Sequence, residues 1–130
     1  MKVKQIKIDP DPYEPYLLSQ GFRVGNLLLI SGQAGIDETG KLVGVGDFDA
    51  QADQAFRNLA RVLEAGGSSL KRVVKVTIFL TDMATNFPKI VELRKKWFTP
   101  PYPADTIVEV KSLYLPEVEI EIEAIAVAAK

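Results

Sequence analysis

The 130-residue sequence contains no cysteine and no histidine. The absence of cysteine excludes disulfide bonds, thiolate nucleophiles and thiolate metal ligands. The absence of histidine excludes imidazole metal ligands and histidine acid–base catalysis. These two absences remove several common classes of enzyme and metal protein.

The sequence also lacks an excess of charge and a long apolar run. Its 16 basic and 17 acidic residues give a net charge of −1, which favours neither a nucleic acid nor a membrane surface as a partner. The N-terminus MKVKQIKI has no apolar segment of signal-peptide length, and no window approaches a membrane span. We therefore expect a cytoplasmic protein.

The composition that remains is that of an ordinary globular chain. Hydrophobic residues make up 47% of it and charged residues 25%, which is too apolar for disorder. A chain of this length can bury roughly two-thirds of its unfolded surface in one core. The sequence therefore predicts a single domain over residues 1–130.

The C-terminal tract from 117 to 128 alternates with period two, which is typical of a strand between two different surroundings. One face carries Val118, Ile120, Ile122, Ala124, Ala126 and Ala128. The other carries Glu117, Glu119, Glu121 and Glu123, followed by Ile125 and Val127. Because this second face becomes apolar halfway along, we expect a central strand whose outer face meets a partner.

The remaining periodicities predict five further strands and two helices. Strands are expected at 3–8, 21–24, 27–31, 73–80 and 106–110, with a two-residue turn at Gly25-Asn26 and a possible additional strand at 41–45. Apolar stripes predict one helix beginning at Asp47 or Asp49 and a second capped by Thr85 or Asn86. The run at 73–80 is typical of a strand buried on both sides.

This order of elements predicts an α+β fold with a mixed sheet of about six strands. Both helices are expected to cover one face of the sheet, and Arg94, on the apolar stripe of the second helix, must pair or reach an edge. The other face then needs a cover, which indicates self-association.

Two weaker patterns have ordinary explanations. Asp9, Asp11 and Glu14 could hold a hard cation, but the prolines between them favour a solvated turn. Gly44-x-Gly46 lacks the further glycine or lysine of a phosphate loop and is more typical of a break before a helix.

Several motifs together resemble one known family. They are Gly21-x-x-Val24-Gly25-Asn26, Ser31-Gly32-Gln33, the helical pattern at 50–59, the strand at 74–83, Pro103-Ala104-x-Thr106-x-Val108-Glu109-Val110 and Glu121-Ile122-Glu123-Ala124-Ile125-Ala126. In this order they resemble the RidA/YjgF family of enamine/imine deaminases, long labelled L-PSP endoribonucleases. The resemblance covers roughly residues 15–128.

The resemblance implies a chorismate-mutase-like fold and a homotrimer around a barrel, with a small-molecule substrate in each of three clefts between subunits. It also implies hydrolysis of reactive 2-imino acids to 2-keto acids and ammonia without a cofactor. The water-holding glutamate of the family maps onto Glu121. Its acidic neighbours two residues away could raise its pKa towards the range in which a carboxylate acts as a general base.

Other expected substrate-binding positions follow from the same resemblance. Ser31 and Gln33 match the edge of the pocket, and Thr106 and Ile107 would supply backbone groups. A tyrosine that the family often carries is Leu18 here, with Tyr16 two residues earlier. An asparagine of some members is Val91.

The main departure lies at Asp105, where the family has an arginine that grips the substrate carboxylate. At an effective dielectric near 20, one like-charge contact at about 4 Å opposes binding by about 4 kcal/mol. Either another cation compensates or the substrate is not a carboxylate. Arg23, Arg94 and Lys111 are the candidate cations.

Three functions are compatible with these residues. The first is an imine deaminase of altered specificity, in which Asp105 attracts an iminium or amine and Glu121 positions water. The second is a trimeric binding protein of the same fold without catalysis. The third, a ribonuclease, ranks last because it has neither histidine nor a basic surface behind it.

Overall fold

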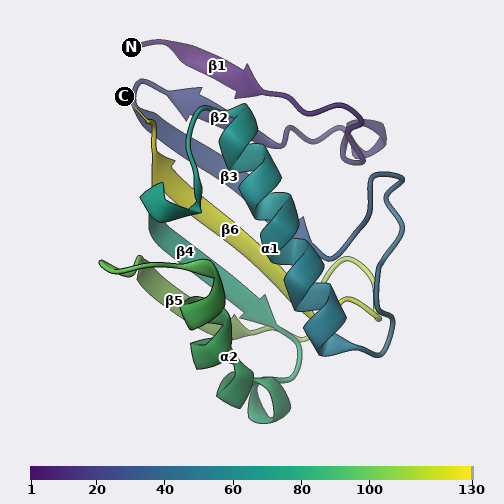
Figure 1. Ribbon diagram of the computed structural model, residues 1–130. Helices are drawn as coiled ribbons and strands as arrows, with labels where there is room; N and C mark the ends of the chain where they lie inside the picture. The colour runs from purple at the N-terminus through teal and green to yellow at the C-terminus, as the bar shows by residue number, and fades with distance from the viewer. Residues whose placement is uncertain (130) are drawn as a thin grey trace.

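The computed structural model describes residues 1–129 and contains one six-stranded sheet with two helices (Figure 1). The strand order is β1-β2-β3-β6-β4-β5, with only the β4–β5 pair parallel. The strands are β1 (Val3–Ile6), β2 (Gly21–Val24), β3 (Leu27–Ala34), β4 (Val73–Leu80), β5 (Ala104–Glu109) and β6 (Ile120–Val127). The helices are α1 (Phe48–Ala65) and α2 (Met83–Trp97). The predicted α+β class with a mixed sheet is confirmed.

The C-terminal strand β6 is central, as its alternation predicts, because it pairs with both β3 and β4. Its predicted inward residues are all buried, from Val118 through Ile122 to Ala128. The strand begins three residues later than expected, at Ile120, because residues 117–119 belong to the preceding loop.

The two helices are fixed by side-chain caps at their first turns. Asp47 accepts a hydrogen bond from the Ala50 amide and begins α1, as predicted. The cap of α2 is Asp82, which accepts from the Thr85 amide, so the expected cap at Thr85 or Asn86 is wrong. β4 ends at Leu80, so only Thr81 separates the strand from the cap of the helix.

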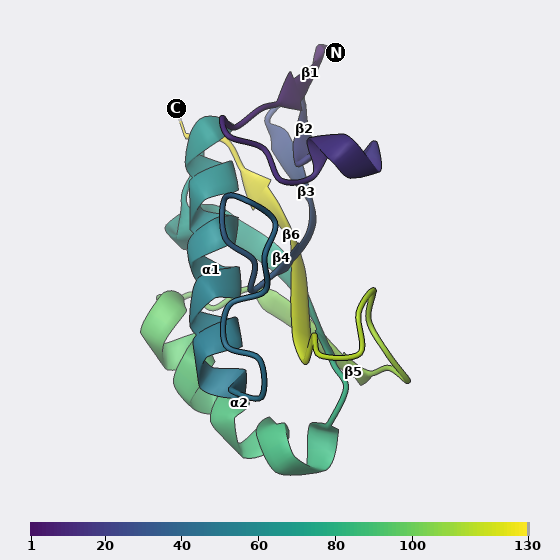
Figure 2. The same ribbon diagram turned by 90° about the vertical axis from the view of Figure 1, so that its right-hand side faces the viewer.

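Both α-helices lie on one face of the sheet, here called the helix face (Figure 2). The opposite face, here called the open face, carries no α-helix of residues 1–129, and only the short 3-10 helix at Glu14–Tyr16 lies on that side. The core lies under α1, where Phe56 and Leu59 meet Ile122 of β6, and all three side chains are fully buried. Leu27 and Leu29 lie on the open face and are 45% and 44% exposed. The prediction that both helices cover one face is confirmed.

Two predicted strands differ in the structure. Residues 41–45 form no strand and contribute only a single bridge between Ile36 and Leu42. β4 is buried on its helix face but only partly covered on the open face, so it is not the doubly buried strand expected from its continuous apolar run. Within residues 1–129, no helix is long and apolar enough to cross a membrane.

Candidate functional site

A pocket of about 690 Å³ lies against the open side of β3 and β6. It is called the Glu121 pocket because Glu121 is the only carboxylate among its lining residues. The other lining residues come from the 13–18 segment, β3, the loop at 36–40 and the loop between β5 and β6: Tyr13, Tyr16, Leu18, Ser31, Gly32, Ile36, Gly40, Tyr114 and Leu115.

The sheet sets the position of the Glu121 carboxylate. Glu121 lies opposite Ala34 of β3 and Phe79 of β4, and the β3–β6 register shifts between Ile30 and Gln33. Gly32 occupies this irregularity, and a Cβ built on it would overlap the Glu121 carboxylate oxygen. Glycine at this position therefore leaves room for the Glu121 carboxylate directly against the backbone.

Burial raises the pKa of Glu121 above its ordinary value, and the negative charge of Glu123 raises it further. The sequence predicted a raised pKa from the two acidic neighbours, but only Glu123 contributes. The Glu119 carboxylate turns to the other face, where it accepts a hydrogen bond of 3.4 Å from Gln51 Nε2. Desolvation by the surrounding tyrosines and loops is the larger cause, and the alternation pattern contained no sign of it.

Two tyrosines near Glu121 were not predicted as site residues. Burial and the charge of Glu121 both raise the pKa of Tyr13 and of Tyr114, so their hydroxyls stay protonated and can donate. The Tyr13 hydroxyl donates to the Gly32 carbonyl oxygen. Tyr13 therefore fixes the backbone that touches the Glu121 carboxylate. Tyr114 lies in the loop before β6, and no local motif marks either tyrosine.

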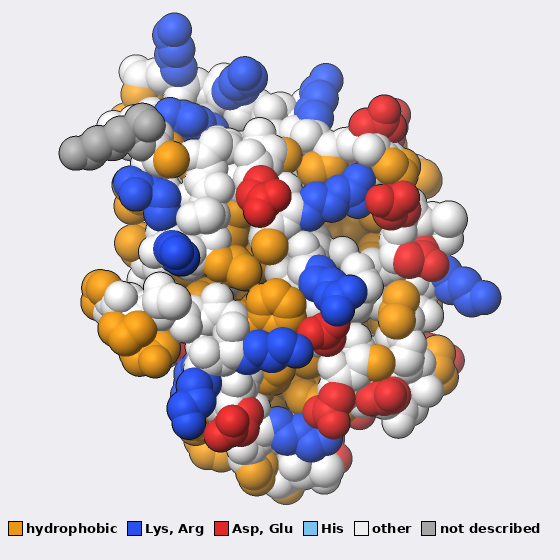
Figure 3. Space-filling view, viewed as in Figure 1, with side chains coloured by type: hydrophobic (Ala, Val, Ile, Leu, Met, Phe, Trp, Pro, Cys, Tyr) orange, Lys and Arg blue, Asp and Glu red, His pale blue; other side chains and the backbone are white. Residues whose placement is uncertain are grey.

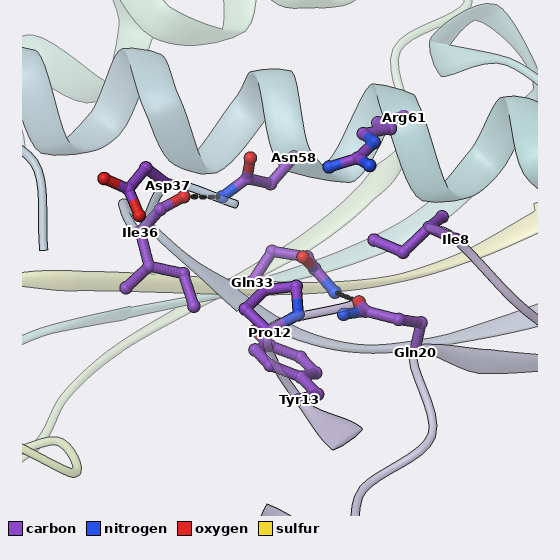
Figure 4. A pocket seen from close by; sticks show the side chains of 9 residues that line it. All are labelled: Ile8, Pro12, Tyr13, Gln20, Gln33, Ile36, Asp37, Asn58 and Arg61. Atoms are coloured by element: carbon purple, nitrogen blue, oxygen red, sulfur yellow. Dashed lines mark hydrogen bonds between the residues drawn. The ribbon is translucent and has the colours of Figure 1, made fainter. Parts of the chain in front are cut away.

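Of the residues expected at the site, Ser31 and Tyr16 line the Glu121 pocket, and Gln33 does not. The Ser31 hydroxyl donates to the Ser19 carbonyl oxygen at 2.6 Å. Gln33 is buried behind the pocket and donates from Nε2 to Gln20 Oε1 at 2.9 Å, the dashed line in Figure 4. Gln20 in turn donates to Asp11 Oδ1 at 2.8 Å. This polar chain supports the Tyr13 segment rather than contacting the pocket.

Asp105 lies on the helix face and forms an ion pair with Arg94 of α2. The distance from Arg94 Nε to Asp105 Oδ2 is 2.9 Å, and the two side chains are 30% and 15% exposed. This confirms that Arg94 must pair. A pocket of about 540 Å³, called the Arg94 pocket, opens beside the pair and is lined by Val91, Arg94, Lys95, Phe98, Tyr102, Pro103 and Asp105.

The remaining predicted positions lie outside both pockets. Arg23 donates to the carbonyl oxygens of Gly25 and Gly66 at 3.2 and 3.5 Å. The Thr106 hydroxyl accepts from Lys75 Nζ at 2.7 Å, and Ile107 packs against the core. Lys111 is exposed. Of the three candidate cations, the structure thus brings only Arg94 to Asp105.

Similar known proteins identify the family of this chain. The family model described as endoribonuclease L-PSP matches residues 7–128. The chain belongs to the RidA/YjgF family. A RutC family protein of Pyrococcus horikoshii is 45% identical over 118 residues, which cover 90% of each chain. A protein of Dermatophagoides farinae named 2-iminobutanoate/2-iminopropanoate deaminase is 38% identical over 118 residues, covering 91% of this chain and 89% of its own.

A solved RidA/YjgF structure supports the same assignment. The crystal structure of RidA from the Antarctic bacterium Psychrobacter sp. superposes with a TM-score of 0.86 at 38% identity, covering 95% of this chain and 98% of that one. Proteins named as imine or reactive intermediate deaminases thus occur among the relatives of this chain. Within residues 1–129, no group of three or more histidine, cysteine, aspartate or glutamate side chains could hold a metal ion.

Proposed function

We propose that this protein hydrolyses the C=N bond of a small imine or enamine to a carbonyl compound and ammonia, with water held by Glu121 and without a cofactor. The observation that carries the proposal is the Glu121 carboxylate, which lines a pocket of about 690 Å³ and has a raised pKa. A general base works best when its pKa lies close to the working pH. Proteins of this family that bear deaminase names support the same reaction.

The reaction balances with one carboxylate and one water. The substrate is taken as the protonated imine. Glu121 accepts a proton from water as the water oxygen bonds to the imine carbon and the C=N electron pair moves to nitrogen, which gives a neutral amine. The same carboxyl group then returns its proton to the nitrogen. The Glu121 carboxylate next accepts the hydroxyl proton as the carbonyl forms and the C–N bond breaks, and it passes this proton to the departing ammonia, which leaves as ammonium. The Tyr13 and Tyr114 hydroxyls remain neutral donors beside these charges.

The specificity is proposed to differ from that of relatives that carry arginine at position 105. Asp105 does not act as an isolated negative charge, because Arg94 Nε lies 2.9 Å from it. The repulsion of a substrate carboxylate expected from Asp105 alone therefore does not apply to the pair. For the same reason, Asp105 is a weaker attractor for an iminium than a free aspartate.

The proposed active form is a homotrimer whose open faces cover one another. The exposed apolar side chains of Leu27 and Leu29 lie beside Ile125 and Val127 of β6 on this face. Such a row in the middle of a sheet favours contact with another copy of the chain.

A non-catalytic trimeric binding protein is the second candidate. One observation favours it: Leu18 lines the Glu121 pocket at the position where the family often has tyrosine. A leucine can neither donate nor accept a hydrogen bond, so a substrate contact is missing unless Tyr16 or Tyr114 replaces it.

An imine-trapping assay separates the two candidates. An amino-acid oxidase generates 2-iminobutanoate or 2-iminopropanoate, and semicarbazide traps whatever imine remains. The wild-type protein is expected to suppress the adduct, and Glu121→Gln is expected to lose this effect by about 100-fold or more. Glu123→Gln is the matched control, because Glu123 shares the strand and the face but does not line the pocket.

The outcomes have distinct meanings. Equal suppression by Glu121→Gln and wild type would overturn the role of Glu121. No suppression by the wild-type protein with either imine, at concentrations where a named deaminase of the family is active, would favour the binding protein. Suppression by wild type and Glu123→Gln but not by Glu121→Gln would support the proposal.

A further inference from the structure

We infer that Arg94, held in place by Asp105, is the anion-binding residue of this protein and confers affinity for ligands with a carboxylate and an apolar body. The inference rests on the proposed function for its link to turnover, but the anion site itself can be tested by binding alone. In relatives with arginine at position 105, the strand residue itself would bind the anion. In this protein, Arg94 of α2 binds the anion and Asp105 of β5 holds Arg94 in place.

The geometry of the ion pair leaves the outer part of the guanidinium available. Arg94 contacts Asp105 through Nε, at 2.9 Å from Oδ2. Among residues 1–129, neither terminal nitrogen of Arg94 donates a hydrogen bond, since the one bond of its side chain is made by Nε. A guanidinium binds carboxylates best through two parallel N–H groups, and such a pair of donors remains on its outer side.

Asp105 is suited to a positioning role. Its side chain is only 15% exposed, on a strand residue paired in register with the fully buried Val76. A buried carboxylate on a rigid strand holds one edge of a long, flexible side chain and reduces the entropy lost when a ligand binds. Asp105 therefore orients Arg94 beside the pocket that both residues line.

The surroundings define the chemical class of the ligand. Two cationic groups, Arg94 and Lys95, and one anionic group, Asp105, line the Arg94 pocket, which leaves one net positive charge. The other lining side chains are apolar or aromatic: Val91, Phe98, Tyr102 and Pro103. A singly charged anion with an apolar body matches this lining, whereas a cation or a strongly polar sugar does not.

The Arg94 pocket and the Glu121 pocket cannot meet within one chain. Arg94 approaches from α2 on the helix face, whereas Glu121 and Glu123 project from the open face of β6. In Figure 2 the helices and the loop before β6 lie on opposite sides of the sheet. A substrate that touches both residues therefore needs Arg94 from a second copy of the chain. β5 is an edge strand, so the Arg94–Asp105 pair lies at the rim of its sheet, where it is within reach of the open face of a neighbouring copy in the proposed oligomer.

The space around Arg94 also distinguishes it from neighbouring cations. Lys96, two residues further on, is tied to Asp53 of α1 at 3.0 Å, and Lys89 pairs with Asp49 at 3.2 Å. Paired charges of both signs, with apolar surface between them, cover this helix face in Figure 3. Arg94 differs from them because its partner is largely buried and a pocket opens beside it.

The test measures binding of 2-oxobutanoate, a stable 2-oxo acid, to the full-length protein by calorimetry. The fluorescence of Trp97 provides a second signal, because it is the only tryptophan in the chain and lies one helical turn from Arg94. Arg94→Gln is expected to weaken binding about 10-fold or more, since a hydrogen-bonded charge pair is lost. Lys96→Gln, which removes the same charge from the same helix, should bind like the wild type.

A double variant with exchanged charges controls for a loss of affinity that is caused only by instability. The double variant Arg94→Asp with Asp105→Arg keeps the ion pair but moves the guanidinium to the strand, and it should regain most of the affinity that Arg94→Asp loses. Unchanged affinity in Arg94→Gln would overturn the inference, as would absence of 2-oxobutanoate binding by the wild-type protein. Equal losses in Arg94→Gln and Lys96→Gln would overturn it too, because the effect would then be one of overall charge.

Failure of this inference is separable from failure of the proposed function. Glu121→Gln should still bind 2-oxobutanoate while losing turnover. If Arg94→Gln binds normally and Glu121→Gln is inactive, the hydrolysis stands and the anion site does not. If Glu121→Gln remains active while Arg94→Gln loses binding, the anion site stands and the role of Glu121 does not.

Discussion

The two faces of the sheet are made from the same strands, yet they serve different purposes. On β6, Ile122 points into the core and is fully buried, whereas Ile125, three residues later, points to the open face and is only partly covered. The helix face is closed by α1 and α2 and supplies stability. The open face leaves its carboxylates and apolar side chains exposed or partly exposed, and we propose that a ligand and another copy bind there. Alternation along one strand thus separates the core from this face.

The largest expected effect comes from breaking the helix face. Ile122→Ala should lower the free energy of unfolding by about 2–5 kcal/mol, because it leaves a cavity under α1. Urea unfolding followed by circular dichroism measures this loss. Ile125→Ala is the matched control on the other face, and its smaller effect should depend on protein concentration. Equal losses at all concentrations would contradict the division between the faces.

The next effect concerns the contact between Gly32 and Glu121. Gly32→Ala should lower imine hydrolysis by about 10- to 100-fold, because the added methyl group displaces the Glu121 carboxylate. The cost in stability should be small, since the displaced group is the end of a flexible side chain. Steady-state kinetics and urea unfolding measure the two quantities. Ser69→Ala, which lies outside the pocket and whose hydroxyl makes no cap hydrogen bond, is the control. Normal turnover in Gly32→Ala would contradict the proposed geometry.

Association should respond to a charge on the open face. Leu29→Asp is expected to weaken self-association by about 10-fold or more, because a carboxylate enters an apolar contact beside Ile125. Sedimentation velocity over a range of concentrations gives the oligomeric state. Val45→Asp changes a more exposed apolar residue in a loop and should leave association intact. A wild-type protein that sediments as a monomer would contradict this prediction. It would also contradict the proposal that Glu121 and Arg94 of two copies form one site.

Much of the fold could be predicted from the sequence because its signals are local. Period-two alternation identified β6 and its buried residues, and the Gly25-Asn26 pair identified the turn between β2 and β3. The strand expected at 41–45 failed because a short apolar run gains a ladder only where a neighbouring strand is in reach. The Asp82 cap was missed because α2 begins two residues after β4 ends at Leu80, so Asp82 was interpreted as part of the turn that stops the strand.

The candidate site was less accessible to sequence reasoning because it is assembled from distant segments. Glu121 could be singled out by its strand pattern and by the family resemblance. Tyr13 and Tyr114 could not, since a single tyrosine in a loop has no periodicity and its contact with Glu121 depends on the tertiary fold. The pairing of Arg94 with Asp105 follows from the packing of α2 on β5, although an arginine on an apolar helical stripe did require a partner.

The pH dependence of turnover should report the charge next to Glu121. Hydrolysis needs the ionised carboxylate, so turnover should fall as the pH drops through the raised pKa of Glu121. Glu123→Gln removes a like charge, lowers that pKa and should shift the midpoint to lower pH by less than about one unit. Glu119→Gln is the control, since Glu119 turns to Gln51. A midpoint that moves with Glu119 but not with Glu123 would contradict the assignment.

The smallest expected effect is that of Glu121→Gln on stability. This variant should lose activity but be slightly stabilised. Because burial raises the folded-state pKa of Glu121, the protonated form is favoured, and this stabilisation is lost as the pH rises through that pKa. Glu121→Gln should therefore be slightly more stable than the wild type at neutral pH and no more stable at low pH. Thermal unfolding at both pH values measures the difference. A variant less stable at neutral pH would indicate that the carboxylate is well paired.

The most direct test of the account is complementation between two inactive variants. Glu121→Gln and Arg94→Gln subunits are co-expressed with different tags, mixed oligomers are purified through both tags, and imine hydrolysis is measured. If each site takes Glu121 from one copy and Arg94 from another, about one site in three in a mixed trimer is intact, and activity should return. Mixed oligomers as inactive as either parent would contradict a site shared between copies.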